Sequence, residues 1–196
     1  MTNIEDNTDK RFQQLSMVTG LTTQSARDEV FKETSAAQKI FLEKVETGIK
    51  EAEKIISRME KEINEVQEIS KNIKKRKKVY FEISPFPSMY TFGKGVFMNE
   101  MLEIAGVENI FNDKTGWFIP SLEVIAARNP DIIFTSTYQV ADPVKEIIDR
   151  GNWNIIKAVR EKRIYPISKE AVRPSTRVTE VIKKISEISY PEYYKK

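Results

Sequence analysis

The 196-residue sequence contains neither cysteine nor histidine. Without cysteine it has no disulfides and no thiolate nucleophile, and without histidine it lacks the commonest general base of enzymes and a principal ligand of zinc. Most catalytic families use one of these groups, so we expect a protein that is not an enzyme, with no catalytic residues, no metal site and no cofactor. An extracytoplasmic protein can do without disulfides, so the missing cysteines do not decide the compartment.

Long apolar runs are also missing. None approaches the ~20 residues of a membrane-spanning helix, and residues 1–10 are polar and lack the hydrophobic stretch of a signal peptide. As written, the chain has no signal peptide and would not be exported. Two interpretations stay open: the chain acts in the cytoplasm, or the natural protein has residues upstream of Met1.

The charges nearly cancel, because 32 basic residues face 29 acidic ones and leave a net charge of +3. This balance gives no reason to expect nucleic acid as a partner. The one basic cluster, residues 74–78, precedes an apolar run and has no interleaved aromatic residues. We therefore interpret it as a solvated helix end rather than a nucleic-acid patch.

Residues 1–77 have a helical composition, rich in glutamate and lysine and without proline. A break at residues 19–22 separates a short first helix from a long second one. In the second helix, apolar residues recur in steps of four and three from Val45 to Ile73, which is a heptad spacing. The apolar stripe could lie on the chain's own domain, or part of it could pair with a second copy to form a homodimer.

Residues 78–196 change to an alternation of strands and helices. Apolar runs predict strands at 79–83, 131–136 and 163–167, and amphipathic spacing predicts helices at 97–105, 122–128, 144–150 and 178–188. The alternation predicts an α/β fold: a small parallel or mixed sheet flanked by helices on both faces, preceded by a long α-helix. Ligands of such sheets gather at the carboxyl ends of the strands, so the loop 84–95 is the first candidate site.

Five segments in order resemble the second lobe of the class III periplasmic binding proteins, which have one long helix between two lobes and serve uptake of ferric siderophores, heme and cobalamin. The resemblance covers Lys77 to Tyr194. Its segments are KKVYFEI, GVFMNEMLEIAGVENIF, SLEVIAARNPDIIF, NWNIIKAVREKRIYPI and YPEYY. A full member has another α/β lobe upstream, where this chain has only helix, so half of the binding cleft is not in this sequence.

The resemblance implies the C-terminal lobe of a substrate-binding component of an ABC importer for iron complexes, siderophore or heme, or for cobalamin. It implies an extracytoplasmic protein, periplasmic or a cell-surface lipoprotein, whose partners are the permease subunits and a small metal chelate. Glu123, six residues after Trp117, matches the family's acidic residue that docks on permease arginines. The alternative is that Glu123 only stabilises the start of its helix.

Six residues are candidates for ligand contact in such a lobe. Trp117 lies in a loop, where its ring could stack on a macrocycle or catecholate, or pack over the sheet edge. The aromatic and basic side chains of the loop 84–95 and a later arginine could contact an anionic ligand, cover the core or face solvent. These further candidates are Met89, Tyr90, Phe92, Lys94 and Arg173. Trp153, by contrast, precedes two isoleucines and is expected in the core.

Two other accounts compete with transport. In the first, the heptad helix makes a dimer and the α/β part is a degenerate scaffold for interactions. In the second, the chain is an enzyme with Asp131 or Glu82 as a base. The enzyme account is disfavoured because the sequence has no nucleophile, metal set or cofactor fingerprint to accompany either carboxylate.

Overall fold

The computed structural model describes residues 17, 23–168 and 173–194. The short first helix expected before the break at 19–22 lies outside the described residues, except for Met17. The chain forms two compact units that divide between Lys54 and Ile55. This division falls inside the long helix, whereas the division into 1–77 and 78–196 was drawn by composition at the end of that helix.

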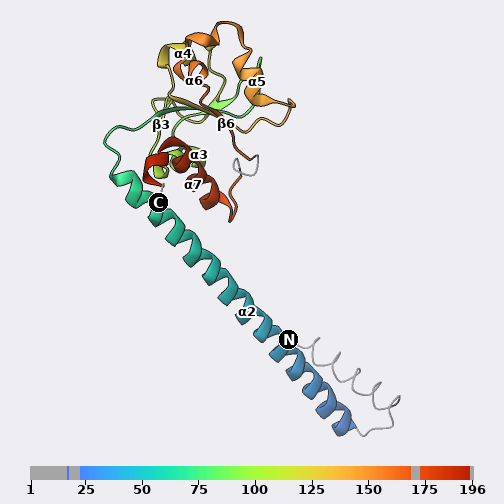
Figure 1. The fold of residues 1–196 in the computed structure, drawn as a ribbon. Coiled ribbons are helices and arrows are strands. Elements are labelled where there is room, and N and C mark those ends of the chain that lie inside the picture. The colour runs from blue at the N-terminus through green and yellow to red at the C-terminus, as the bar shows by residue number, and fades with distance from the viewer. Residues whose placement is uncertain (1–16, 18–22, 169–172, 195–196) are drawn as a thin grey trace. The chain divides into compact units, whose positions relative to one another are not determined.

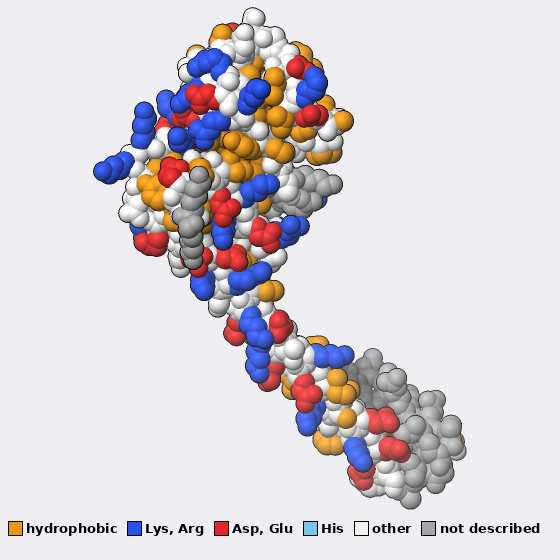
Figure 2. Space-filling model, viewed as in Figure 1, with side chains coloured by type: hydrophobic (Ala, Val, Ile, Leu, Met, Phe, Trp, Pro, Cys, Tyr) orange, Lys and Arg blue, Asp and Glu red, His pale blue; other side chains and the backbone are white. Residues whose placement is uncertain are grey.

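The predicted long helix is present as α2 (Thr23–Lys71). In the first unit, the described side chains of this helix up to residue 54 are all exposed, except for the half-buried Val30. Pairs such as Lys54 with Glu51 link neighbouring turns on its surface. Figure 2 shows hydrophobic side chains lying between acidic and basic ones along it.

In the second unit, the last turns of α2 pack on the α/β lobe. Val66 is buried in the lobe's core, and Ile63 and Ile73 pack against the same cluster. The Thr179 hydroxyl also donates a hydrogen bond to the Glu62 carboxylate. The interpretation that the stripe lies on its own domain is therefore confirmed from Ile63 onward.

The lobe is built on a four-stranded parallel sheet with the strand order β3-β1-β5-β6. Its strands are β1 (Lys78–Glu82), β3 (Glu108–Asn109), β5 (Ile132–Thr135) and β6 (Ile164–Pro166). Tyr80 is in register with Ile133, and Phe134 with Tyr165. Three of these strands were predicted; β3 was missed because two residues are too short to show a period.

The helices agree closely with the predicted ranges. The predicted ones are α3 (Phe97–Ile104), α4 (Leu122–Arg128), α5 (Pro143–Ile148) and α7 (Val178–Ser189). Shorter elements that were not predicted are α6 (Lys157–Arg160) and the 3-10 helices η1 (Gly151–Ile155) and η3 (Pro191–Tyr193). In the described part of the chain, no helix is long and apolar enough to cross a membrane.

Helices cover both faces of the sheet (Figure 1), and each face has its own core. Val79 and Phe81 of β1 point into a cluster with α3, α7 and the end of α2. Tyr80, between them, points into a second cluster with α4, α5 and α6, which also holds Trp153. The alternation follows from the two-residue period of a strand, and it confirms Trp153 as a core residue.

A small antiparallel pair, β2 (Thr91–Phe92) and β4 (Trp117–Phe118), lies beside the carboxyl end of β1. The Thr91 hydroxyl donates to the Phe81 carbonyl at 2.7 Å, and the Ile83 N–H donates to the Tyr90 carbonyl at 2.9 Å. These bonds fold the loop after β1 back onto the sheet. The side chains of this pair are thereby placed at the edge where ligands of parallel sheets gather.

Candidate ligand-binding and docking surface

Two aromatic side chains are partly exposed at the carboxyl edge of the sheet. The side chain of Trp117 is 45% exposed and that of Tyr90 is 41% exposed. The indole of Trp117 rests edge-on against the ring of Phe92, with 5.8 Å between ring centroids. The Tyr90 N–H donates to the Ser84 hydroxyl at 3.0 Å, which holds its backbone in place. Both side chains are thus partly open to solvent, and the indole of Trp117 is also supported by the ring of Phe92.

Met89 and Phe92 do not share this exposure. Phe92 is fully buried in the core that α3 and α7 cover, where its ring lies 5.5 Å from that of Phe81. Met89 is buried in the opposite core, and its sulfur accepts a hydrogen bond from Arg150. The expectation that these two side chains contact a ligand does not fit their burial. Both residues of β2, Thr91 and Phe92, are buried, whereas Tyr90 lies just before this strand and is exposed.

Lys94 and Arg173 are exposed on the same lobe. Lys94 follows Gly93, whose N–H donates to the Gly116 carbonyl at 2.9 Å. A Cβ on Gly93 would lie 2.2 Å from the Lys114 carbonyl oxygen, so only glycine allows the two backbone segments to meet. The glycines around Lys94 therefore serve strand pairing. The Lys94 side chain is left free to face a ligand or solvent.

Glu123 lies in the first turn of α4, beside the helix cap. The Ser121 hydroxyl accepts a hydrogen bond from the Val124 N–H, which caps the helix as the sequence predicts. The Glu123 carboxylate is exposed, and its pKa is lowered by its own backbone N–H and by the Ser121 hydroxyl. An exposed carboxylate in the first turn of a helix is also favoured by the helix dipole.

Glu123 also borders a cavity of the lobe that is about 410 Å³ in volume. The walls are mostly apolar and come from the loop after β1, from α4 and from η1. Their side chains include Phe86, Leu122, Ala126, Trp153 and Ile155. This cavity was not predicted from the sequence, because its walls come from three separate segments.

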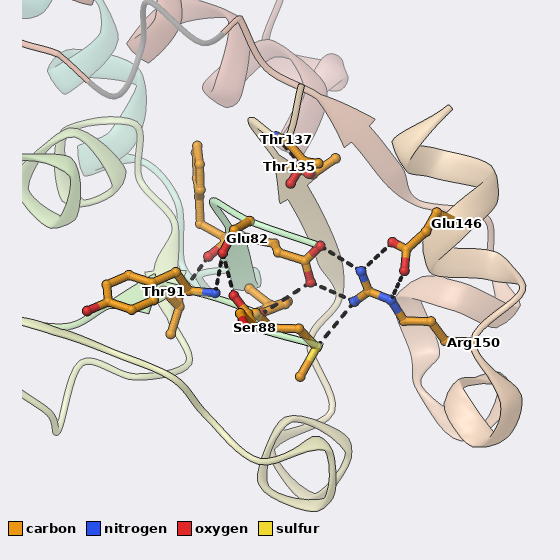
Figure 3. A network of polar contacts seen from close by, with 12 residues as sticks. Glu82, Ser88, Thr91, Thr135, Thr137, Glu146 and Arg150 are labelled. Carbon is orange, nitrogen blue, oxygen red and sulfur yellow. Dashed lines mark hydrogen bonds and ion pairs between the residues drawn. The ribbon is translucent and has the colours of Figure 1, made fainter. Parts of the chain in front are cut away.

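Behind the ligand edge lies a buried ion network (Figure 3). Arg150 donates to both carboxylate oxygens of Glu82, at 2.6 Å and 2.8 Å, and to the carboxylate of Glu146. Burial raises the pKa of the Glu82 carboxyl, and the hydrogen bonds from Arg150 oppose that shift. The Arg150 guanidinium lies 4.5 Å from the centre of the Trp153 ring. Sequence reasoning missed this network.

The carboxyl end of β5 carries a row of small hydroxyl side chains. Ser136 and Thr137 are buried, and neither hydroxyl has a hydrogen-bond partner in the structure. The hydroxyl of Thr135 accepts the Thr137 N–H at 3.2 Å, and the Ser136 N–H donates to the Glu82 carbonyl. Unsatisfied buried hydroxyls next to the ligand edge are groups that a polar ligand atom could reach after a small rearrangement.

The carboxylates considered as catalytic bases are both engaged in structural contacts. Asp131 accepts hydrogen bonds from the Lys157 ammonium at 2.7 Å and from the Lys78 N–H at 2.9 Å, and Glu82 is bound by Arg150. Among the residues that the structure describes, no three histidine, cysteine or acidic residues gather as they would to hold a metal ion.

Comparison with known proteins decides the family of this lobe. The model of the periplasmic binding protein family matches residues 43–171. The chain belongs to this family. The family comprises substrate-binding transport proteins and is not a class of enzymes. The match begins within α2 and covers most of the α/β lobe.

Relatives support the assignment in sequence and in structure. An uncharacterized ABC transporter substrate-binding lipoprotein of Bacillus subtilis, YvrC, is 36% identical over 149 residues, which are 74% of this chain and 46% of the relative. A solved structure of a possible iron-binding, periplasmic solute-binding protein from Staphylococcus epidermidis is 30% identical, with a TM-score of 0.63 over 72% of this chain and 55% of that one.

A second solved structure has the same fold. The periplasmic heme-binding protein RhuT from a Roseiflexus species is 18% identical, with a TM-score of 0.63 over 71% of this chain and 55% of that one. This chain therefore spans about half the length of the relatives that it matches. The fold of this chain matches about half of each of these two solved structures.

Proposed function

We propose that this chain is the C-terminal lobe of a substrate-binding component of an ABC importer, and that its ligand is an iron complex, ferric siderophore or heme, or cobalamin. The observation that carries the proposal is the exposure of Trp117 and Tyr90 at the carboxyl edge of a parallel sheet. Relatives described as iron-binding and heme-binding proteins support the ligand class. YvrC, described as a substrate-binding lipoprotein, supports an extracytoplasmic place of action.

The side chains on this edge suit an aromatic, anionic chelate. Flat rings offer stacking surface, and the exposed cations Lys94 and Arg173 of the same lobe would favour carboxylate or catecholate oxygens. In this account the ligand lies between this lobe and a companion lobe. Cobalamin stays within the class because its corrin ring offers a broad face for stacking, although it would gain less from the two cations.

Glu123 is the proposed contact to the permease. Its carboxylate is exposed in the first turn of α4, where a partner can reach it. An arginine on the partner could bind it through two parallel hydrogen bonds. The apolar cavity beside it would accept a neighbouring apolar side chain of the same partner.

Tryptophan fluorescence tests the ligand proposal. The full two-lobed protein, with the companion lobe supplied, is titrated with hemin, cyanocobalamin and a ferric catecholate siderophore. We expect one of them to quench the emission, and Trp117→Phe to remove most of the change while Trp153→Phe leaves it. Quenching by none of the three, or quenching that persists in Trp117→Phe, would show that the proposed site is wrong.

Uptake into proteoliposomes that carry the permease tests the docking proposal. Glu123→Arg should reduce ligand-stimulated uptake at least tenfold while ligand quenching stays intact. The matched control is Glu161→Arg, a charge reversal at another exposed glutamate of the lobe. Equal uptake by both variants would remove Glu123 from the docking surface.

A second function, an interaction protein that dimerises through α2, is favoured by one observation. Apolar side chains of this helix that lie before the lobe contact, among them Val45, Ile49 and Ile56, are exposed. Light scattering over a range of concentrations separates a stable dimer from a monomer. Ile63 is unsuited to testing the dimer because it packs on the lobe.

A further inference from the structure

A second cavity, about 370 Å³ in volume, lies where the segment between α2 and β1 meets the residues after α7. Small-molecule sites in proteins typically have volumes of about 300–1,000 Å³, so this one has room for a small ligand. Residues 72–77 form one wall, and Asp131, Lys157, Tyr190 and Tyr193 contribute to the others. All of these residues belong to the second unit. The cavity is therefore formed by distant segments of one folded unit.

This cavity lies at the amino ends of the strands. Lys77 and Asp131 directly precede the parallel strands β1 and β5, and the Asp131 N–H donates to the Lys78 carbonyl at 2.8 Å. Trp117 and Tyr90 are at the carboxyl ends, on the opposite edge of the sheet. In the proposed function the transported ligand and the companion lobe face that opposite edge. The amino-edge cavity is therefore separate from the site already described.

Four consecutive cations, residues 74–77, line the cavity, and we call them the basic wall. The side chains of Lys74, Lys75 and Arg76 are exposed, and none of the three forms an ion pair with a residue that the structure describes. Figure 2 shows lysine and arginine side chains gathered on the side of the lobe where this segment runs. Like charges on neighbouring residues repel one another, and a bound anion would relieve that repulsion.

The other described residues of the cavity do not neutralise the basic wall. Asp131 accepts a hydrogen bond from the Lys157 ammonium at 2.7 Å, so this pair adds no net charge. Glu192 is the other acidic residue among those that line the described cavity. The dipole of α2 does not account for the wall, because a helix dipole acts within the last turn, where Lys71 lies. The cavity therefore has an excess of positive charge that favours an anion.

We propose that this cavity binds a soluble anion that carries phosphate groups, such as pyrophosphate or a phosphate ester. Arginine donates two parallel hydrogen bonds to a phosphate, and a lysine ammonium acts on it as a point charge. The backbone N–H groups of residues 74–76 donate to no residue in the described part of the chain, so they are also available to phosphate oxygens. A single carboxylate has one charge and would leave most of the wall uncompensated.

A lipid headgroup offers the same phosphate chemistry, but the proposed docking favours a soluble source. Helix α4 follows β4 at the carboxyl edge and ends shortly before Asp131 at the amino edge, so Glu123 in its first turn is on the carboxyl side. Docking through Glu123 turns the carboxyl edge toward the permease and the amino edge away from the bilayer. This choice of source rests on the proposed function, whereas the anion site itself does not.

Isothermal titration calorimetry with sodium pyrophosphate tests the site. The full chain is titrated at neutral pH and low salt, with sodium acetate at equal ionic strength as the comparison. We expect one saturable pyrophosphate site per chain and no saturable heat with acetate. The double variant Lys75→Gln with Arg76→Gln should bind pyrophosphate at least tenfold more weakly. No saturable binding of pyrophosphate by the unchanged chain would overturn the proposal.

A matched control separates the site from general electrostatic attraction. The double variant Lys183→Gln with Lys184→Gln removes the same charge from an exposed pair on α7 and should bind pyrophosphate as the unchanged chain does. Glu192→Gln should bind it severalfold more tightly, because an acidic residue of the cavity is removed. Circular dichroism confirms that each variant is folded. Equal losses in the two double variants, or a Glu192→Gln variant with unchanged affinity, would place the anion outside this cavity.

Vesicles of phosphatidylcholine, with and without phosphatidylglycerol, test the source. At physiological salt we expect the unchanged chain and the Lys75→Gln, Arg76→Gln variant to sediment equally little with either kind of vesicle. Anionic vesicles that bind the unchanged chain but not this variant would identify a lipid headgroup as the source, contrary to the proposal. These experiments use neither the permease nor the imported ligand. Their failure would leave the transport function standing, and a failure of hemin, cobalamin and siderophore to quench Trp117 would leave the anion site standing.

Discussion

The guanidinium of Arg150 binds both carboxylate oxygens of Glu82, 68 positions earlier in the chain. The side chain of Arg150 is 6% exposed and that of Glu82 is 1% exposed. The pair ties the segment after α5 to the carboxyl end of β1, directly behind the loop that carries Tyr90. Because the pair is buried and fixes the end of β1, we expect the stability of the lobe to depend on it.

Replacing Arg150 by methionine should strongly destabilise the lobe. The change leaves the Glu82 carboxylate buried without its cation, and breaking such a pair typically costs about 3–5 kcal/mol. Urea unfolding followed by circular dichroism measures the loss. We expect the midpoint to fall sharply with an unchanged slope.

The control for this prediction removes both charges. The double variant Glu82→Gln with Arg150→Met should recover a large part of the lost stability, because the fully buried carboxylate of Glu82 is gone and the remaining one, Glu146, is 26% exposed to water. If the single variant were as stable as the unchanged protein, the network would have no structural role. A double variant no better than the single one would assign the loss to packing against Trp153 rather than to charge.

The sequence predicts the framework of the lobe because the signals for it are local. The apolar runs of β1 and β5 are strands with alternate faces in two cores. Helix α4 ends at Arg128 and is capped by Asn129, just before Pro130, where the backbone turns left-handed. Gly106 ends α3 at a positive φ of 82°, as a helix-ending glycine should. Each of these features depends on residues that are near one another in the chain.

The site is less predictable because its parts come from distant segments. The ion network joins β1 to α5, and the cavity beside Glu123 joins three segments; neither leaves a pattern along the chain. The misfit of Met89 and Phe92 has the same origin. The polar and proline-containing composition of the loop 84–95 suggests that its side chains are exposed. The pairing of β2 with β4, which the sequence does not reveal, places Phe92 in a buried strand instead.

Alanine substitutions at Gly93 and Gly151 test whether the backbone of residue 93 lies against that of Lys114, with Gly151 as the control. Gly93→Ala should destabilise the lobe by about 2 kcal/mol or more, because the new Cβ meets the Lys114 carbonyl oxygen at 2.2 Å and neither backbone can yield easily. Gly151→Ala meets no atom within 4 Å and should change stability by less than about 1 kcal/mol. Thermal unfolding of both variants checks the difference. Equal melting temperatures would show that β2 and β4 do not approach as described.

The two tryptophans should respond oppositely to a soluble quencher. Trp117 is 45% exposed and Trp153 is 3% exposed, so acrylamide should quench the first and largely spare the second. In Trp117→Phe, the remaining emission should be poorly quenched; in Trp153→Phe, it should be strongly quenched. The reverse pattern would place the indole of Trp117 in the interior and remove it from the ligand edge.

Stability should fall in alkaline solution, and Tyr190 contributes to that fall. Its buried hydroxyl accepts the Lys77 N–H and donates to the Gly106 carbonyl, both at 2.8 Å. Burial raises the pKa of this phenol above the ordinary value of 10.0, and the hydrogen bond from Lys77 only partly opposes it. Above pH 10, the unfolded chain therefore loses the phenolic proton before the folded protein does, and the free energy of unfolding decreases as the pH rises toward the raised pKa.

Urea unfolding between pH 7 and pH 11 measures this effect against Tyr190→Phe. The variant should be less stable by about 1–2 kcal/mol at pH 7, since the Lys77 N–H and the Gly106 carbonyl lose their partner. Its stability should also decline less steeply above pH 10. Tyr80, whose pKa burial raises well above its usual value, keeps part of the decline in the variant. A variant with the same alkaline slope as the unchanged protein would mean that the Tyr190 phenol ionises equally in the folded and unfolded states, contrary to its buried place between α7 and the end of α3.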